Sequence, residues 1–149
     1  MKRIVLLTAL AAMMAAAMAL SGVAQAKPIT NGKADAKCLV EAIQTLGPSF
    51  NPGTYNFVGG TEGTDRYDTT IPATADPDVI CGFGGDDLVA TVAADDIFLG
   101  GEGRDRVTRD NFGTVYGGTG DDFVRVNYGT FNGEAGIDDV GSGTGTFVQ

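Results

Sequence analysis

The chain has 149 residues, with 19 acidic and 10 basic side chains, a formal net charge of −9 and no histidine. This negative charge makes nucleic acid and anionic lipid poor partners. The absence of histidine removes the commonest general base and the commonest zinc and copper ligand. The length is enough for one small domain.

Residues 1–26 have the pattern of a secretory signal peptide. A basic head precedes an apolar run at 4–20, and residues 21–26 end in the small-x-small pattern that signal peptidase cleaves. A retained membrane anchor is the alternative, although the run is short for a span of about 20 residues. We therefore expect a secreted, extracellular protein that begins at Lys27 and has no transmembrane segment. Its net charge is −11, because loss of Lys2 and Arg3 removes two basic residues and no acidic ones.

Residues 27–58 are expected to form an N-terminal cap with one helix at 35–46. Asp35 is suited to the N-cap position, apolar residues recur on one face, and a Gly-Pro pair stops the helix. Two cysteines, Cys38 and Cys81, predict a disulfide in an exported protein, which would attach the cap to the segment that follows. Two buried free thiols are the alternative.

Residues 59–149 repeat a nine-residue phrase, G-G-x-G-x-D-x-U-x, in which U is a large apolar residue. The four best copies are Gly82–Ala90, Gly100–Thr108, Gly117–Arg125 and Gly133–Gly141. Weaker copies lie between them, so the best-matching phrase recurs once every two copies. Glycines allow sharp turns, and the last three residues of each copy can form a short strand. Two copies make one coil, so the sequence predicts a mostly β fold, a parallel β-roll (β-solenoid) of about four to five coils.

Stacked coils would place the sixth-position aspartates in a column along one edge. Carboxylates that lie so close together repel one another, and a hard cation between successive turns would remove the repulsion. Ca²⁺ binds six to eight oxygens, and glycine turns expose backbone carbonyls that can supply some of them. The alternative is that these aspartates are solvated turn residues, since Asp is common in turns.

These repeats, and above all the stretch DVICGFGGDD, resemble the RTX, or haemolysin-type, calcium-binding repeats over about residues 59–149. The resemblance implies several calcium ions, each held between successive coils by sixth-position aspartates and turn glycines. The chain departs from the family on its second edge, where glycine replaces the ligand after Asp96, so we expect a one-sided column there. The implied ligands are Asp87, Asp105, Asp122, Asp138, Asp78, Asp96, Gly82, Gly84, Gly100, Gly103, Gly117, Gly120, Gly133 and Gly136.

We therefore expect a secreted calcium-binding repeat protein without catalytic activity, structural or adhesive at or outside the cell surface, whose folding depends on calcium. An extracellular hydrolase of the glycosidase type, with paired aspartates on a calcium-stabilised solenoid, is the alternative. Only the short segment 27–58 lies between the leader and the repeats, and no nucleophile motif is present. A flat-faced binder of ice or polysaccharide would need a regular array of Thr or aromatic residues at the ninth positions, which show none.

Overall fold

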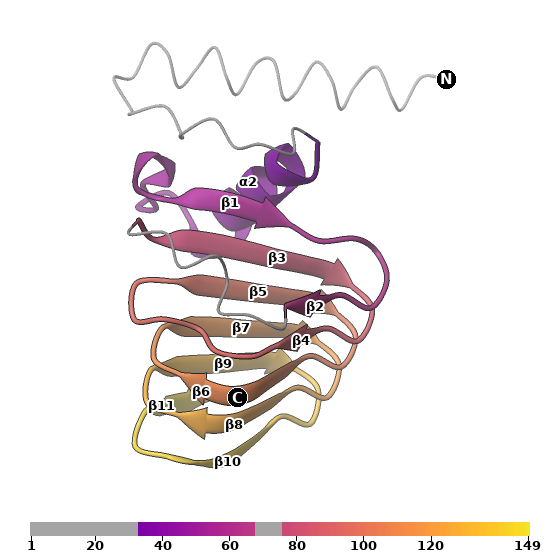
Figure 1. Ribbon diagram of the computed structural model, residues 1–149, viewed down its shortest axis with the longest axis vertical. Coiled ribbons are helices and arrows are strands. Elements are labelled where there is room, and N and C mark those ends of the chain that lie inside the picture. The colour runs from indigo at the N-terminus through magenta and orange to yellow at the C-terminus, as the bar shows by residue number, and fades with distance from the viewer. Residues whose placement is uncertain (1–32, 68–75) are drawn as a thin grey trace.

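The structure is a computed structural model that describes residues 33–67 and 76–149. In these ranges the chain forms one helix and then a parallel β-solenoid of about four turns, which confirms the predicted fold class (Figure 1). The expected signal peptide at 1–26 lies outside the described residues. No described helix has the length and apolar character needed to cross a membrane.

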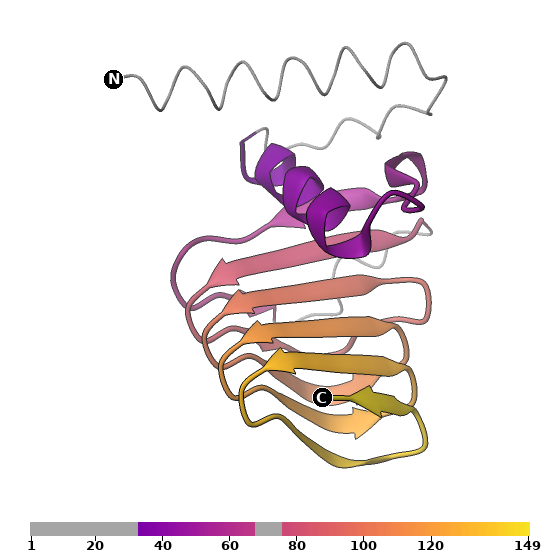
Figure 2. The same cartoon turned by 180° about the vertical axis from the view of Figure 1, so that it is seen from behind.

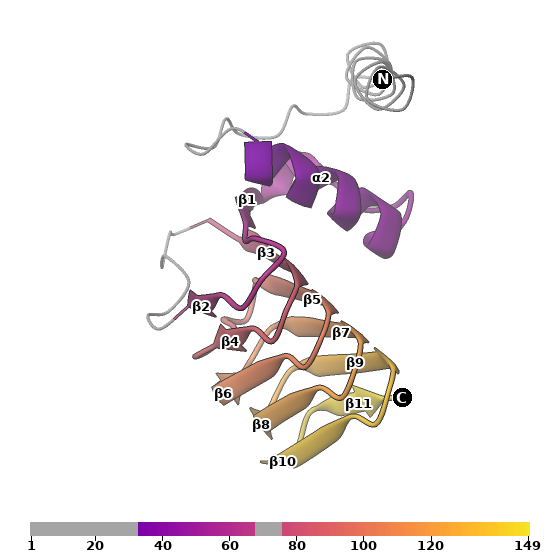
Figure 3. The same cartoon turned by 90° about the vertical axis from the view of Figure 1, so that its right-hand side faces the viewer.

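Each coil contributes one strand to each of two parallel sheets (Figures 1 and 3). Sheet A contains β1 (Asn56–Gly59), β3 (Asp78–Gly84), β5 (Ile97–Glu102), β7 (Thr114–Thr119), β9 (Thr130–Ala135) and β11 (Thr146–Val148). Sheet B contains β2 (Arg66–Tyr67), β4 (Leu88–Val89), β6 (Arg106–Asn111), β8 (Phe123–Asn127) and β10 (Asp139–Gly143).

The apolar eighth positions of the repeats form the core between the two sheets. In sheet B, Val89 pairs with Val107 and Val107 with Val124, and all three are buried. Sheet A supplies the facing column in the same register, and its members are Ile80, Phe98, Val115 and Phe131. The core therefore follows the repeat spacing that the sequence predicts.

Helix α2 (Lys33–Leu46) and a short 3-10 turn (Pro52–Thr54) form the cap, which covers the outer face of sheet A at its first strands (Figure 2). The Cys38–Cys81 disulfide joins the helix to β3, with the two Cα atoms 5.5 Å apart, as predicted. The predicted start of the helix is wrong. It begins at Lys33, so Asp35 lies within the helix and not at its N-cap.

Candidate functional site: the aspartate column

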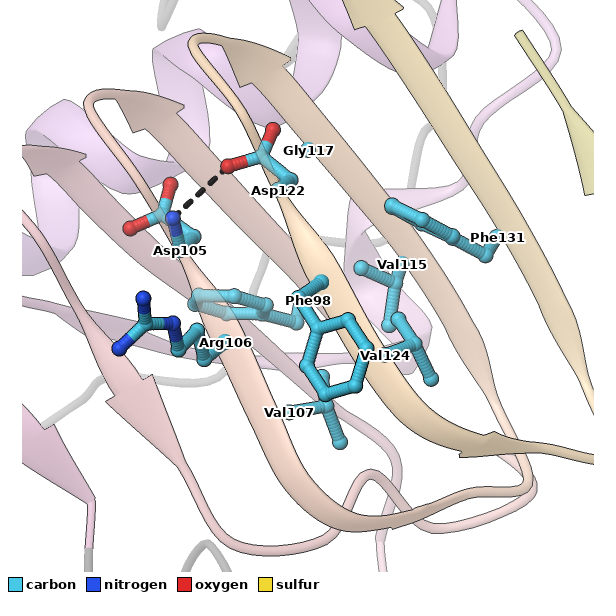
Figure 4. Close-up of a pocket in the computed structure, with 10 residues that line it drawn as sticks. Phe98, Asp105, Arg106, Val107, Val115, Gly117, Asp122, Val124 and Phe131 are labelled. Atoms are coloured by element: carbon cyan, nitrogen blue, oxygen red, sulfur yellow. Dashed lines mark hydrogen bonds between the residues drawn. The ribbon is translucent and has the colours of Figure 1, made fainter. Parts of the chain in front are cut away.

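Sheet B positions a column of buried aspartates, because each sixth-position Asp directly precedes one of its strands. One carboxylate oxygen of each Asp accepts a hydrogen bond from the backbone N–H of the Asp one coil earlier. The distance is 2.8 Å from Asp105 N to Asp122 Oδ1 (Figure 4). It is 2.8 Å from Asp87 N to Asp105 Oδ1 and 3.0 Å from Asp122 N to Asp138 Oδ1. Oδ1 therefore fastens each coil to its neighbour.

The second carboxylate oxygen of these aspartates is buried and has no hydrogen-bond partner. This holds for Oδ2 of Asp87, Asp105, Asp122 and Asp138, whose residues are at most 6% exposed. An ionised carboxylate offers about four lone-pair sites, and burying it without partners is costly. Four such oxygens in a row identify a place where the protein alone leaves negative charge unsatisfied.

The first glycine of each repeat makes room for these oxygens. A Cβ added to Gly100 would overlap both Asp105 Oδ2 and the Gly117 carbonyl oxygen, so a carboxylate and a backbone oxygen converge on one small space. Gly82 and Gly117 have the same relation to Asp87 and Asp122. Glycine is needed at this position to bring two oxygens together.

The second and fourth repeat positions turn the backbone through conformations that favour glycine. Gly101 and Gly103 have φ of 105° and 125°, and a Cβ on Gly103 would overlap the carbonyl oxygen of Gly85 one coil earlier. In the first of these repeats, glycine occupies both the third and the fourth positions. Gly84 lies opposite Glu102 and is thus a third-position residue, while Gly85, with φ of 99°, occupies the fourth.

Burial makes the carboxyl groups of Asp87, Asp105 and Asp122 weaker acids. Desolvation raises the pKa of Asp105 to about 7, and those of Asp87 and Asp122 to about 6, from an ordinary value of 3.8. The backbone hydrogen bond to each carboxylate lowers its pKa, and the neighbouring carboxylates raise it further. At neutral pH the column therefore needs either protons or a cation.

Asp65 begins the same column but differs from the others. Its Oδ2 accepts hydrogen bonds from Thr61 N at 2.6 Å and from Thr61 Oγ1 at 3.0 Å. Its backbone N–H donates to Asp87 Oδ1 at 2.7 Å. The series of unsatisfied oxygens therefore starts at Asp87, one coil later.

The second edge is charged only near its start. Asp78 N donates to Asp96 Oδ1 at 3.0 Å, and burial raises the pKa of Asp96. One coil later, a Cβ on Gly113 would overlap the carbonyl oxygens of Ala93 and Asp96, so no side chain fits. The later coils are shorter, and their turns approach one another too closely for an aspartate.

Two buried asparagines, which the sequence reasoning missed, replace the carboxylates on this edge. Asn111 Nδ2 donates to Asn127 Oδ1 at 2.8 Å and to Thr130 O at 3.0 Å, and Asn127 Nδ2 donates to Thr146 O at 2.8 Å. The sequence feature that could have revealed them is a repeated phrase outside the nonapeptide pattern, R-x-N-[F/Y]-G-T, which occurs at 109–114 and again at 125–130.

No group of three or more Asp, Glu, Cys or His side chains surrounds a common point in residues 33–67 and 76–149. An ion between two coils would therefore depend on backbone carbonyls as well as on the aspartates. Comparison of the chain with family models, with curated proteins and with solved structures found no match.

Proposed function

We propose that this chain is an exported calcium-binding repeat protein of the RTX type, without catalytic activity, whose folding is coupled to ion binding. The observation that supports this most is the column of four buried Oδ2 atoms without hydrogen-bond partners. Negatively charged oxygens set beside backbone carbonyls suit Ca²⁺, which prefers oxygen ligands and tolerates irregular geometry.

The sites would lie between successive coils. Asp105 Oδ2 and the Gly117 carbonyl oxygen already converge, and the turn carbonyls at the second and fourth positions point toward the next coil. We assign one site to each consecutive pair of aspartates from Asp87 to Asp138, and one to Asp78 with Asp96 on the second edge. A bound calcium ion would supply the positive charge that these carboxylates lack. The chain supplies the spacing through its Oδ1 hydrogen bonds.

A calcium titration of the purified protein tests the proposal. Circular dichroism and isothermal calorimetry, each with and without chelator, should show β-structure that depends on calcium. Half-saturation is expected at about 10⁻⁴–10⁻³ M, the range of extracellular calcium modules. Magnesium serves as the control, since its strict octahedral geometry suits these turns poorly. An unchanged spectrum and melting temperature in chelator would contradict the proposal.

The place of action that we propose is outside the cytoplasm, in a structural or adhesive role. The Cys38–Cys81 disulfide supports this, because such bonds persist in oxidising compartments. The leader-like segment at 1–26 supports it independently. Fractionation of cells that express the full chain should recover the protein, shortened at its N-terminus, outside the cytoplasm. Recovery of the full-length chain in the cytoplasm would contradict this assignment.

A further inference from the structure

The repeated phrase R-x-N-[F/Y]-G-T spans the end of a sheet B strand and the corner that follows. Its two copies, at 109–114 and 125–130, lie on adjacent coils, because Asn111 pairs with Asn127 in the sheet. The matching segment of the next coil, at 141–146, reads GSGTGT and keeps only the final glycine and threonine. The feature is thus confined to two neighbouring coils.

Within the phrase, the asparagine is buried and the aromatic residue is exposed. The Asn111–Asn127 ladder fixes the corner from inside, while Phe112 and Tyr128 are 48% and 52% exposed. Their rings stack with centroids 5.3 Å apart and planes 10° apart. Two large stacked rings on the outside of a corner contribute little to the core, so the stack presents apolar surface to solvent.

Exposed arginines lie on the two strands that precede the aromatic pair. Arg106, Arg109 and Arg125 are exposed on β6 and β8, and in the described part of the chain none of them forms an ion pair. By contrast Arg104, in the turn before β6, pairs with Asp121 at 3.4 Å. The register places Arg106 opposite Phe123, so a cross-strand charge pair does not account for this arginine.

We propose that this surface binds a linear anionic glycan that carries sulfate or carboxylate groups. The surface, which we call the arginine–aromatic face, consists of Arg106, Arg109, Arg125, Phe112 and Tyr128. Guanidinium groups bind planar or tetrahedral anions through paired hydrogen bonds. The aromatic stack offers apolar surface to the C–H faces of the sugar rings.

The face is open, and its aromatic stack lies away from the aspartate column, whereas Arg106 directly follows Asp105. No described helix or strand covers the outer face of sheet B, whereas α2 covers part of sheet A (Figure 3). Asp105 precedes β6 and Phe112 follows it, so the column and the aromatic stack lie at opposite ends of the strand. The proposal therefore goes beyond calcium binding and uses none of the calcium ligands.

The charge distribution favours a thin polymer over a membrane or a nucleic acid. The chain carries a net charge of −9, and acidic turn residues such as Asp86 and Asp121 lie within one or two coils of the arginines. A bilayer or a duplex extends past the face and would meet these carboxylates, whose repulsion acts over about 8 Å at physiological salt. A single glycan chain is thinner and can follow the arginines along β6 and β8, where the half-buried Asp110 is the acidic neighbour of Arg109.

Binding of the whole protein, kept in calcium, to immobilised heparin and hyaluronan tests the proposal. Heparin presents sulfate and hyaluronan presents only carboxylate, and dextran is the uncharged control. The double variant Arg109→Gln/Arg125→Gln should lose on the order of a hundredfold in affinity, about tenfold for each charge-assisted contact. The slope of log affinity against log salt should fall by about two. Arg104→Gln removes the same charge from the turn and should bind like the parent.

The salt dependence of binding distinguishes the contribution of the aromatic residues from that of the arginines. Tyr128→Ala should weaken binding without changing the salt slope, because no charge is lost. Circular dichroism in calcium identifies any variant that fails to fold. If the double variant fails to fold, Arg125→Lys is used in its place. It keeps the charge but not the planar guanidinium group, and it should bind more weakly than the parent. Equal binding by the double variant and Arg104→Gln would overturn the proposal. Binding to dextran, or tighter binding to single-stranded DNA or phosphatidylglycerol vesicles, would also overturn it.

Discussion

Replacing Asp105 with Asn should change stability in opposite directions with and without calcium. The amide keeps an acceptor for the Asp87 N–H, which lies 2.8 Å from Asp105 Oδ1, and places a donor where Oδ2 meets Gly117 O. Burial raises the pKa of Asp105 from 3.8 to about 7. Each unit is worth about 1.4 kcal/mol, so removing the ionised carboxylate should stabilise the calcium-free fold by about 4 kcal/mol above the pKa.

In calcium the same change should remove ligands from two adjacent sites, since Asp105 lies at the centre of the column. At about pH 8, urea unfolding followed by circular dichroism gives the free energy of unfolding in calcium, the β-signal in chelator shows which protein is more folded without the ion, and calorimetry gives the number of ions bound. Asp110→Asn is the matched control, because Asp110 lies on β6 outside the column. The reasoning fails if Asp105→Asn destabilises the protein in chelator, or if it binds as many ions as Asp110→Asn.

Two further predictions concern protons and glycine. The pKa values of Asp87 and Asp122 are raised to about 6 in the folded protein. The calcium-free protein should therefore be most stable below about pH 4 and lose stability as the pH rises to about 7. A urea midpoint in chelator that rises with pH would contradict this prediction. Gly100→Ala should reduce calcium binding and stability, because the added Cβ would overlap Asp105 Oδ2. Gly63→Ala is the control, since its Cβ would lie 4.0 Å from Thr61 Oγ1, and it should match the parent in melting temperature and ion stoichiometry.

The periodic features of the fold could be predicted from the sequence, because each repeat makes the same contacts as its neighbours. Glycine, aspartate and the apolar residue recur at fixed offsets, which sets the register of Val107 against Val124 and places Asp105 beside Asp122. The disulfide followed from the presence of two cysteines in a chain that the sequence predicts to be exported. These features depend on residue type and spacing alone.

The features that could not be predicted depend on contacts specific to one coil. Nothing in the spacing shows that Thr61 satisfies Asp65 Oδ2, which removes the first coil from the series of unsatisfied oxygens. The Asn111–Asn127 ladder falls in degenerate copies of the repeat, so a search for aspartate passes over it. The exposed stack of Phe112 and Tyr128 lies in the same degenerate copies.

The two edges of the solenoid differ in whether the side chains that join successive coils are neutral or charged. On the second edge Asn111 and Asn127 fasten successive coils through neutral amide hydrogen bonds, so a coil of this size needs no carboxylate to stack on the next. On the first edge the aspartates join successive coils by accepting backbone N–H hydrogen bonds through Oδ1, and each also buries a second, charged oxygen without a partner. On the second edge Asn111 Oδ1 is likewise without a partner, but it is neutral. An amide would serve for stacking alone. The carboxylate therefore adds only its charge, and a buried row of like charges is stable only with protons or cations between its members.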